Sequence, residues 1–358
     1  MTLSAIALLG RKDEPTDAVE EYCRYLRSAL ESQDIQMQIR RVPWASRGWR
    51  EALRGLRLQA ANWRNTWVLV QYTALAWSAR GFPMRFLRVL RVLKSAGARI
   101  GVVYHDVEPF SSPRLVDRLR QRVQMHTMRQ AMKLADSAIF TVPPEKLSWL
   151  STVPQKAVFI PVGPNLPFPE MPLAASSTEI PNVGVFSITG GEQGARETKD
   201  ILVAVRKAMQ EIGRLRLSVF GRHAELREGV LRKGLQDLPV EISVEGVAEA
   251  KRIVECLTAC DVLLFVRKGI STRRSSGIAG IAAGLPIVAY RNAETSPPIT
   301  DAGIVLVEES RAEEAGDALA RILRDTNLRA ELAARSRSAY EANFAWPAIA
   351  QRYAALLK

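Results

Sequence analysis

Short apolar runs alternate with amphipathic stretches along most of this chain. Six runs of strand length occur before residue 163, and they are rich in Val, Ile and Leu. They cover residues 4–9, 35–42, 67–72, 98–104, 137–142 and 157–162. Most of the segments between them carry apolar residues at helical spacing. This alternation predicts a doubly wound α/β domain with a parallel sheet.

The pattern breaks once and then restarts. Between residues 163 and 181, prolines and polar residues replace the apolar runs, which is typical of a linker. Six further runs follow, over residues 183–188, 215–220, 240–245, 262–266, 286–290 and 303–307. We therefore expect two Rossmann-like, doubly wound domains that face each other across a cleft. The expected divisions are a first domain at 1–165, a linker at 166–181, a second domain at 182–340 and a C-terminal helix at 341–358 that packs back toward the first domain.

Length and composition agree with two domains. A chain of 358 residues exceeds what one hydrophobic core usually serves, and 47% hydrophobic content can fill two cores. Cys23, Cys256 and Cys260 form no CxxC pair, so we expect reduced core thiols in a cytosolic protein. The first residues lack the basic region of an export signal, and no apolar stretch is long enough to span a bilayer. We expect a cytoplasmic protein that is soluble or peripheral to a membrane.

Positive charge is concentrated in the first half. The net charge is +13, and residues 40–133 hold nineteen Lys or Arg against four Asp or Glu. Between residues 85 and 94, basic residues recur at every third position with apolar residues between them, which on a helix gives a cationic stripe beside an apolar one. The members of this stripe are Arg85, Arg88, Arg91 and Lys94. A second basic segment contains Arg114, Arg118, Arg120, Arg122, Arg129 and Lys133.

Two interpretations of this charge stay open: a solvated outer helix face, or a surface that docks on an anionic membrane. For a membrane, about 1 kcal/mol per basic residue would suffice for reversible docking. Nucleic acid is disfavoured as a partner because no helix-turn-helix, zinc-finger or aromatic stacking signature accompanies the charge.

The segment 268–290 carries the clearest chemistry. A basic turn rich in hydroxyl groups opens a helix of small residues, and the helix ends at a Gly-Leu-Pro before a strand-like run. Amide groups at a helix N-terminus lack partners, and the helix dipole favours an anion there. Charge and hydrogen-bond donors are added at that point by Arg273, Arg274, Ser275 and Ser276. The pattern predicts a phosphate-binding turn.

Other expected strand ends of the second domain also carry glycine or basic residues. They supply Thr189, Gly190 and Lys199 in the first loop, Arg222 and His223 in the second, Gly246 and Val247 in the third, and residues 267–271 in the fourth. Each could be a plain turn when taken alone. Because the carboxyl ends of parallel strands meet at one edge of a sheet, we expect these residues to join the basic turn in one phosphate pocket.

Three enzyme classes are disfavoured. The three histidines show no metal-ligand spacing, so we expect no bound metal. No GxSxG motif follows a strand, as a serine hydrolase of this class would require. A dehydrogenase would fit the alternation, but the glycine-rich dinucleotide fingerprint is absent after the first strand.

Seven segments of the second half occur in a characteristic order. They are 219–222 (VFGR), 244–247 (VEGV), 260–265 (CDVLLF), 275–277 (SSG), 284–289 (GLPIVA), 301–306 (DAGIVL) and 344–353 (FAWPAIAQRY). Their order and spacing resemble the donor domain of GT-B glycosyltransferases, especially glycosyltransferase family 4. The resemblance covers residues 183–357 well. It extends more loosely to the first half through 71–72 (QY), 104–106 (YHD) and 160–165 (IPVGPN).

The resemblance implies an enzyme that moves a sugar from a nucleotide-sugar donor to an acceptor held by the first domain, without a bound metal and mostly with retention of anomeric configuration. It implies that Arg273 and Arg274 neutralise the departing diphosphate. Backbone amides near Ser275 and Ser276 would meet the sugar and the phosphates. Gly10, at the end of the first strand, is expected to border the diphosphate from the other domain.

The expected catalytic groups lie at the end of the fourth strand. His105 would hydrogen-bond the donor sugar, and Asp106 or Glu108 would receive the acceptor proton or orient the nucleophile. A His-Asp pair at a strand end can equally cap a helix. In the family, two glutamates with seven residues between them contact the donor sugar and the ribose. Here those two positions hold Ser271 and Ala279.

We therefore expect a cytoplasmic GT-B hexosyltransferase at the inner face of the cell membrane, acting in surface-polysaccharide or glycolipid assembly. A basic domain with an apolar stripe suits a lipid-linked saccharide acceptor. Two alternatives remain. One is a catalytically silent relative that binds nucleotide sugar or scaffolds a polysaccharide complex, which the missing glutamates favour. The other is a sugar-nucleotide epimerase on the same fold.

Overall fold

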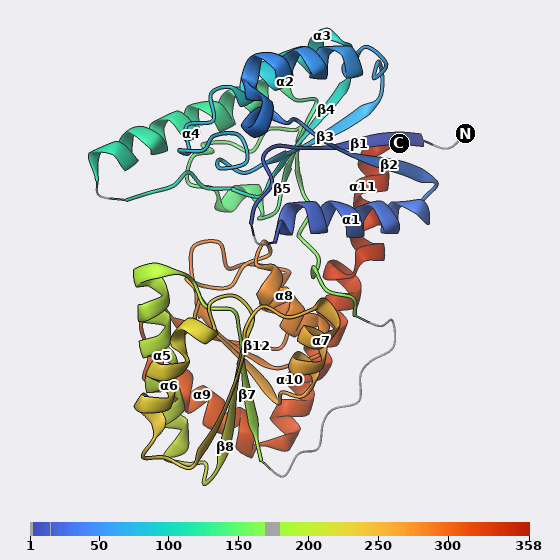
Figure 1. Ribbon diagram of the computed structural model, residues 1–358. Helices are drawn as coiled ribbons and strands as arrows, with labels where there is room; N and C mark the ends of the chain where they lie inside the picture. The colour runs from blue at the N-terminus through green and yellow to red at the C-terminus, as the bar shows by residue number, and fades with distance from the viewer. Residues whose placement is uncertain (1–2, 15, 113, 169–179) are drawn as a thin grey trace. The chain divides into compact units, whose positions relative to one another are not determined.

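The structure is a computed structural model that describes residues 3–14, 16–112, 114–168 and 180–358, and it divides into two α/β units (Figure 1). Unit 1 consists of Met1–Val162 and Trp346–Lys358, and unit 2 of Gly163–Ala345. Most of the expected linker, residues 169–179, lies outside the described residues. Each unit is described below by itself.

Unit 1 is built on a six-stranded parallel sheet with the order β2-β1-β3-β4-β5-β6. Its strands are β1 (Leu3–Leu9), β2 (Ile35–Arg41), β3 (Trp67–Tyr72), β4 (Arg99–Tyr104), β5 (Ser137–Phe140) and β6 (Ala157–Phe159). The helices are α1 (Ala18–Glu31), α2 (Trp44–Ala60), α3 (Phe86–Ser95), α4 (Leu115–Leu134), the short η1 (Pro144–Lys146) and α11 (Trp346–Leu357). Figure 1 shows α2, α3 and α4 on one face of the sheet and α1 with α11 on the other.

Helix α3 contains the cationic stripe predicted from residues 85–94, but its apolar side is not available to a membrane. Phe86, Leu90 and Leu93 are fully buried, and they pack in the core between the sheet and the neighbouring helices. The charged positions Arg85, Arg88, Arg91 and Lys94 remain exposed. Of the two interpretations left open by the sequence, the structure of this helix therefore supports a solvated outer face, because the apolar stripe is buried in the core.

Unit 2 repeats the architecture with a six-stranded parallel sheet of order β12-β11-β10-β7-β8-β9. Its strands are β7 (Asn182–Phe186), β8 (Leu215–Phe220), β9 (Val240–Glu245), β10 (Val262–Phe265), β11 (Ile287–Arg291) and β12 (Ile304–Glu308). The helices are α5 (Gly191–Met209), η2 (Glu225–Arg227), α6 (Glu228–Leu235), α7 (Ala250–Thr258), α8 (Ser275–Ala282), η3 (Ile299–Asp301), α9 (Ala312–Arg324), α10 (Thr326–Ala339) and the π-helical turn η4 (Tyr340–Phe344). Every strand-like run of the sequence thus forms a strand, and the predicted pair of Rossmann-like domains is confirmed.

The last helix, α11, completes unit 1 although it follows unit 2 in the chain. The Tyr22 hydroxyl of α1 donates to the Tyr353 hydroxyl at 2.9 Å, and the indole nitrogen of Trp67 donates to the Leu357 carbonyl at 3.0 Å. The Trp346 ring stacks on Tyr25 with ring centroids 5.5 Å apart. Two elements of unit 1 that are far apart in sequence are therefore held together by buried aromatic side chains.

Tyr353→Ala is expected to lower the free energy of unfolding by about 3–5 kcal/mol, the range for a large aromatic side chain removed from a core. Tyr353 is fully buried, and its removal also leaves the Tyr22 hydroxyl without its acceptor. Urea denaturation followed by circular dichroism measures the change. Gln351→Ala, at an exposed position of the same helix, is the control. Equal stability of the two variants would show that α11 contributes little to unit 1.

Candidate functional site

In each sheet the strand order reverses beside its first strand. In unit 1 the chain runs from β1 to β2 on one side and then crosses to β3 on the other side of β1. In unit 2 it runs from β7 through β8 to β9 and then crosses to β10 on the other side of β7. The loops at the carboxyl ends of these strands diverge at such a reversal, and open α/β sheets bind ligands there. The two positions to examine are therefore the β1–β3 edge of unit 1 and the β7–β10 edge of unit 2.

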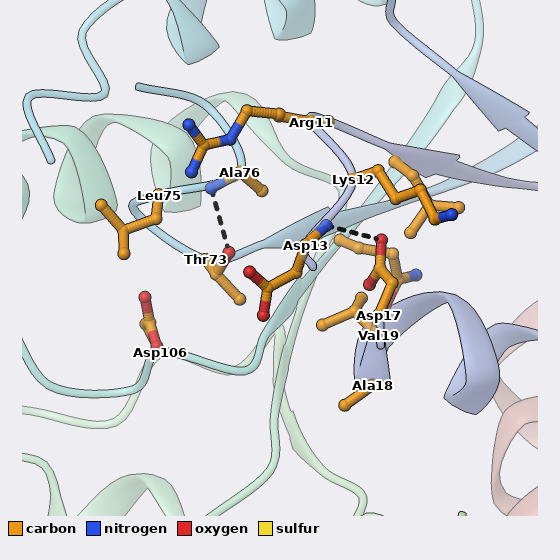
Figure 2. A pocket seen from close by; sticks show the side chains of 13 residues that line it. Arg11, Lys12, Asp13, Asp17, Ala18, Val19, Thr73, Leu75, Ala76 and Asp106 are labelled. Carbon is orange, nitrogen blue, oxygen red and sulfur yellow. Dashed lines mark hydrogen bonds between the residues drawn. The ribbon is translucent and has the colours of Figure 1, made fainter. Parts of the chain in front are cut away.

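The β1–β3 edge holds a cavity of about 230 Å³ (Figure 2). Its lining comes from residues 9–13 after β1, residues 17–19 at the start of α1, and from Gln71, Thr73, Leu75, Ala76 and Asp106 at the ends of β3 and β4. Figure 2 shows the carboxylates of Asp13 and Asp106 on the wall of this cavity, together with the Thr73 side chain. The cavity therefore offers acidic and hydroxyl groups, with Arg11 and Lys12 at its margin.

Gly10 allows the loops after β1 and β3 to touch. A Cβ atom at this position would lie 2.3 Å from the Ala76 carbonyl oxygen, which is backbone and cannot move aside cheaply. The next residue, Arg11, donates its backbone N–H to that same carbonyl at 2.7 Å. The sequence placed Gly10 at a diphosphate, and the structure places it in the lining of this cavity.

Asp17 and Arg41 fix the loop that forms one side of the cavity. The Asp17 carboxylate caps α1 by accepting the Glu20 backbone N–H at 3.1 Å, and it accepts from the Arg41 guanidinium at 3.0 Å. Arg41 also donates to the Gly10 carbonyl at 2.8 Å and to the Glu20 carboxylate at 2.6 Å. Asp17 and Arg41 were not predicted from the sequence, because their partners lie on other strands and helices.

Asp106 is the one predicted catalytic residue that lines the cavity. Its Oδ2 accepts the Ala74 backbone N–H at 2.7 Å, so the carboxylate also organises the loop after β3. Glu108 has a different role. Its two carboxylate oxygens accept the backbone N–H and the hydroxyl of Ser148, both at 2.6 Å. Glu108 therefore holds the loop after η1, and it is not among the residues that line the cavity.

His105 lies next to the cavity and is held by Gln71, which does line it. The Gln71 side-chain amide donates to the Leu69 carbonyl at 3.1 Å, which identifies the other amide atom, Oε1, as an acceptor. His105 Nε2 lies 2.8 Å from this Oε1, so Nε2 carries the proton and Nδ1 is left as an acceptor. The ring also packs edge-on against Tyr22, with centroids 5.1 Å apart. Burial lowers the pKa of His105 to about 4 and outweighs the opposing charge of Asp17, so the imidazole is neutral at physiological pH.

At the β7–β10 edge of unit 2, the loop after β7 is tied to α5. The Thr189 backbone N–H donates to Glu197 Oε2 at 2.7 Å, and Gly190 caps the helix. The His223 ring lies close to Gly190, since a Cβ atom there would be 3.3 Å from Nε2. Glu197 is almost fully buried, and its other oxygen, Oε1, has no hydrogen-bond partner among the described residues.

Two arginines at this edge are desolvated without full hydrogen bonding. Arg267 follows β10 and donates to the Ser276 hydroxyl at 3.2 Å, while Arg274 immediately precedes α8. The Nε of each lacks a partner within the described part of the chain. Burial lowers the pKa of Arg267, and burial together with the charge of Arg273 lowers the pKa of Arg274 to about 10. An anion bound here would satisfy both guanidinium groups.

Unlike its neighbour Arg274, the Arg273 side chain is paired with a carboxylate among the described residues. Its guanidinium makes a two-pronged contact with the Glu294 carboxylate, with both N–O distances at 2.7 Å, and the Ser271 hydroxyl donates to the same carboxylate at 2.9 Å. Burial alone would raise the pKa of Glu294, but the hydrogen bonds and charge of Arg273 lower it, so Glu294 is ionised. Arg273 therefore braces the turn, while Ser275 and Ser276 begin α8 beside Arg274.

The remaining predicted donor residues are arranged around this edge at varying depth. The backbone carbonyl of Arg222 accepts the Ile188 N–H at 2.9 Å. The Arg222 side chain lies close enough to Arg267 for its charge to contribute to lowering the pKa of Arg267. A Cβ atom at Gly246 would lie 1.9 Å from a Glu225 carboxylate oxygen, the end of a flexible side chain, so Gly246 packs directly against Glu225. Val247 and Lys199 are exposed residues.

The sequence placed Arg267 in the expected pocket as part of residues 267–271, because it directly follows an apolar strand run. Glu197 and Glu294 were not chosen from the sequence. The two glutamates gave no such signal, because each reaches the edge from a helix or loop whose approach only the folded chain defines. No group of three or more His, Cys, Asp or Glu side chains that could hold a metal ion occurs within the described ranges, and metal independence stays a prediction. No helix in the described part of the chain is long and apolar enough to cross a bilayer.

Two Rossmann-like units, each with a strand reversal beside its first strand, define a class of doubly wound α/β proteins. No protein-family model matches the chain, and no curated protein matches it by sequence. Solved structures do match it over nearly its whole length. Anabaena Alr3699/HepE in complex with UDP has 14% sequence identity and a TM-score of 0.65, covering 100% of this chain and 99% of that one.

Two further solved structures give the same result. Sucrose-phosphate synthase (tll1590) from Thermosynechococcus elongatus has 16% identity and a TM-score of 0.69, covering 99% of this chain and 98% of that one. A glycosyltransferase from Rickettsia africae has 13% identity and a TM-score of 0.67, covering 100% and 98%. At these identities the likeness shows the fold, so the predicted GT-B fold is confirmed. The narrower resemblance to family 4 stays a prediction.

His105 is expected to make stability depend on pH. Its pKa is about 4 when folded against 6.5 for a free imidazole, so the unfolded chain binds the proton first as pH falls. Stability is therefore lost as pH drops from 6.5 toward 4. Between about pH 7 and about pH 5, the wild type should lose about 1–2 kcal/mol more than His105→Gln in urea denaturation. His126→Gln, at an exposed position, should keep the wild-type dependence. Identical pH profiles for wild type and His105→Gln would contradict the assignment of a buried neutral imidazole.

Proposed function

We propose that this protein is a glycosyltransferase, specifically a hexosyltransferase, which transfers a sugar from a nucleotide-sugar donor to a saccharide or lipid-linked saccharide. The observation that carries the proposal is the pair of desolvated guanidinium groups, Arg267 and Arg274, at the N-terminus of α8. The fold likeness supports it, because Alr3699/HepE was solved with UDP and with UDP-glucose.

The donor diphosphate would bind at the β7–β10 edge. Phosphate oxygens accept hydrogen bonds from the first backbone N–H groups of α8, where the helix dipole favours negative charge. Arg267 and Arg274 add charge at the oxygens that gain it when the bond between the sugar carbon and the phosphate oxygen breaks. Gly190, Thr189 and the nearby His223 would lie along the sugar phosphates. Arg222, Gly246 and Val247 would border the nucleoside.

The acceptor would bind in the cavity of unit 1. Its hydroxyl oxygen forms the new bond to the sugar carbon, and its proton passes to a nearby base. Asp106 is the carboxylate that lines the cavity and is proposed for that role. His105 is neutral and offers Nδ1 as an acceptor, which suits a hydrogen bond from a sugar hydroxyl. Glu108 is proposed to act only through the loop that it holds at Ser148.

The absence of the family's paired glutamates does not leave the donor turn without a carboxylate. Ser271 stands at the first of the two positions, and its hydroxyl contacts the ionised Glu294 carboxylate at 2.9 Å. Glu294 thus supplies negative charge beside the place where the resemblance expects it. Ala279, at the second position, is buried and supplies none. This arrangement favours a working transferase over a silent relative.

The wider setting is proposed from the family resemblance and from the charge of unit 1. Transfer with retention, donor binding without a metal, and a role in surface-polysaccharide or glycolipid assembly follow from the resemblance. The excess of basic residues in unit 1 supports a cytoplasmic protein that is peripheral at the anionic inner face of the membrane. No feature of either site favours nucleic acid as the acceptor.

The first test is a thermal-shift screen against UDP, GDP, ADP and their sugar conjugates without added metal. A ligand at about 100 times its dissociation constant should stabilise the protein by roughly 2.7 kcal/mol. A shift confined to one nucleotide class identifies the donor, and release of that nucleotide from its sugar conjugate in the presence of saccharide acceptors establishes transfer. Binding without release would support the silent relative, interconversion of donor sugars would support the epimerase, and no shift with any nucleotide would refute the donor site.

Arg267→Ala and Arg274→Ala are each expected to weaken binding of the nucleotide found in that screen by at least about tenfold, because a hydrogen bond to a charged group contributes about 1.5–3 kcal/mol. The unliganded variants should be no less stable than the wild type, since each loses a poorly solvated charge. Arg232→Ala removes an exposed arginine paired with Glu228 on α6 and serves as the control. Unchanged affinity in both site variants would place the phosphates elsewhere.

A further inference from the structure

The first half of α4 presents apolar side chains to solvent. Leu115 is 80% exposed, Leu119 56% and Val116 53%, and their spacing puts them on one side of the helix. Figure 1 shows the N-terminal end of α4 projecting past the strands of unit 1. Phe110 is exposed as well, and its ring lies near Arg120 of the same helix. Exposed apolar side chains on one side of a helix mark an interaction surface.

These residues are held together by polar contacts on the buried side of α4. The Gln124 side chain accepts the Phe110 N–H at 2.7 Å and donates to the Gly81 carbonyl at 2.9 Å. The Arg120 guanidinium lies 5.5 Å from the centroid of the Phe110 ring and contacts the Arg80 carbonyl at 3.0 Å. The loop that carries Phe110 is therefore fixed to α4, and we call Phe110, Leu115, Val116 and Leu119 the apolar patch.

Positive charge adjoins this patch on the same helix. Arg114, Arg118 and Arg122 follow one another at four-residue intervals, which places them beside Leu115 and Leu119, and all three are exposed. Asp117, the only acidic residue of α4, is buried and paired with Arg120. The helix thus has three sides: one packed on unit 1, one apolar and exposed, and one cationic.

We propose that this patch inserts into the interface of an anionic lipid bilayer while the flanking arginines contact lipid headgroups. Basic and exposed apolar sides on one helix are the features of helices that lie in a membrane interface. A protein partner would need acidic groups facing the arginines, whereas an anionic bilayer supplies them over the whole cationic side. Helix α3 does not compete for this role because its apolar side is buried.

The position of the patch agrees with the proposed lipid-linked acceptor, on which this inference rests. Leu75 lines the acceptor cavity and is exposed. The cavity and the apolar patch both belong to unit 1, so the same unit would hold the acceptor and the membrane contact.

The test measures vesicle binding, so it does not depend on turnover. The purified full chain is sedimented with vesicles of equal parts phosphatidylglycerol and phosphatidylcholine, or of phosphatidylcholine alone, at low and high salt. The wild type should bind the anionic vesicles only. Leu115→Ser with Leu119→Ser should lower the partition coefficient by about tenfold or more, since each side chain loses its burial in lipid. Arg118→Gln with Arg122→Gln should also lower the partition coefficient, and the decrease should be larger at low salt than at high salt.

The controls separate this inference from the proposed function. Leu58→Ser alters an equally exposed leucine on α2 of the same unit and should bind vesicles as the wild type does. The thermal shift with nucleotide should be unchanged in all of these variants, so a failed donor site and a failed membrane site give different results. Wild-type vesicle binding by the double leucine variant would overturn the proposal. A change from dimer to monomer in that variant, with no change in vesicle binding, would also overturn it and assign the patch to a second copy of the chain.

Discussion

The structure depends on a constraint of parallel sheets, in which the carboxyl ends of all strands lie at one edge. Where the strand order reverses, the loops that follow the two neighbouring strands lead to opposite sides of the sheet and leave a crevice between them. Both units contain such a reversal, next to β1 and next to β7. At the first, Gly10 brings two loops into contact around a cavity. At the second, Arg267 and Arg274 approach the start of α8. Topology thus gives the position of each proposed site before any side chain is considered.

Electrostatics then distinguish the two edges. The edge of unit 2 holds cations whose pKa is lowered by burial, so its unliganded form carries charge that water solvates poorly. The edge of unit 1 holds carboxylates and a neutral histidine. In the function we propose, a phosphate ligand would relieve the first environment, and hydroxyl groups would match the second. The edge of unit 2 would then be kept for binding rather than for folding.

Much of the fold could be predicted from the sequence because strand burial in parallel sheets produces continuous apolar runs, and every such run formed a strand. The turn at Arg274 was also predictable, since its basic and hydroxyl residues precede a helix directly. Other features were not. Arg273 and Arg274 are adjacent and chemically identical, yet Glu294, from a distant loop, pairs with one of them. In the same way, the amphipathic patterns of α3 and α4 do not tell which apolar side the core will cover.

The return of α11 to unit 1 has a consequence for the order in which the chain folds. Unit 2 is one continuous segment, Gly163–Ala345, so all of its strands and helices are synthesised before α11. Until α11 follows, the surfaces of unit 1 around Tyr22 and Trp67 lack the partners that they have in the folded protein. Unit 2 can therefore complete its fold before unit 1 does. Removal of α11 would destabilise the unit that is built from the first 162 residues.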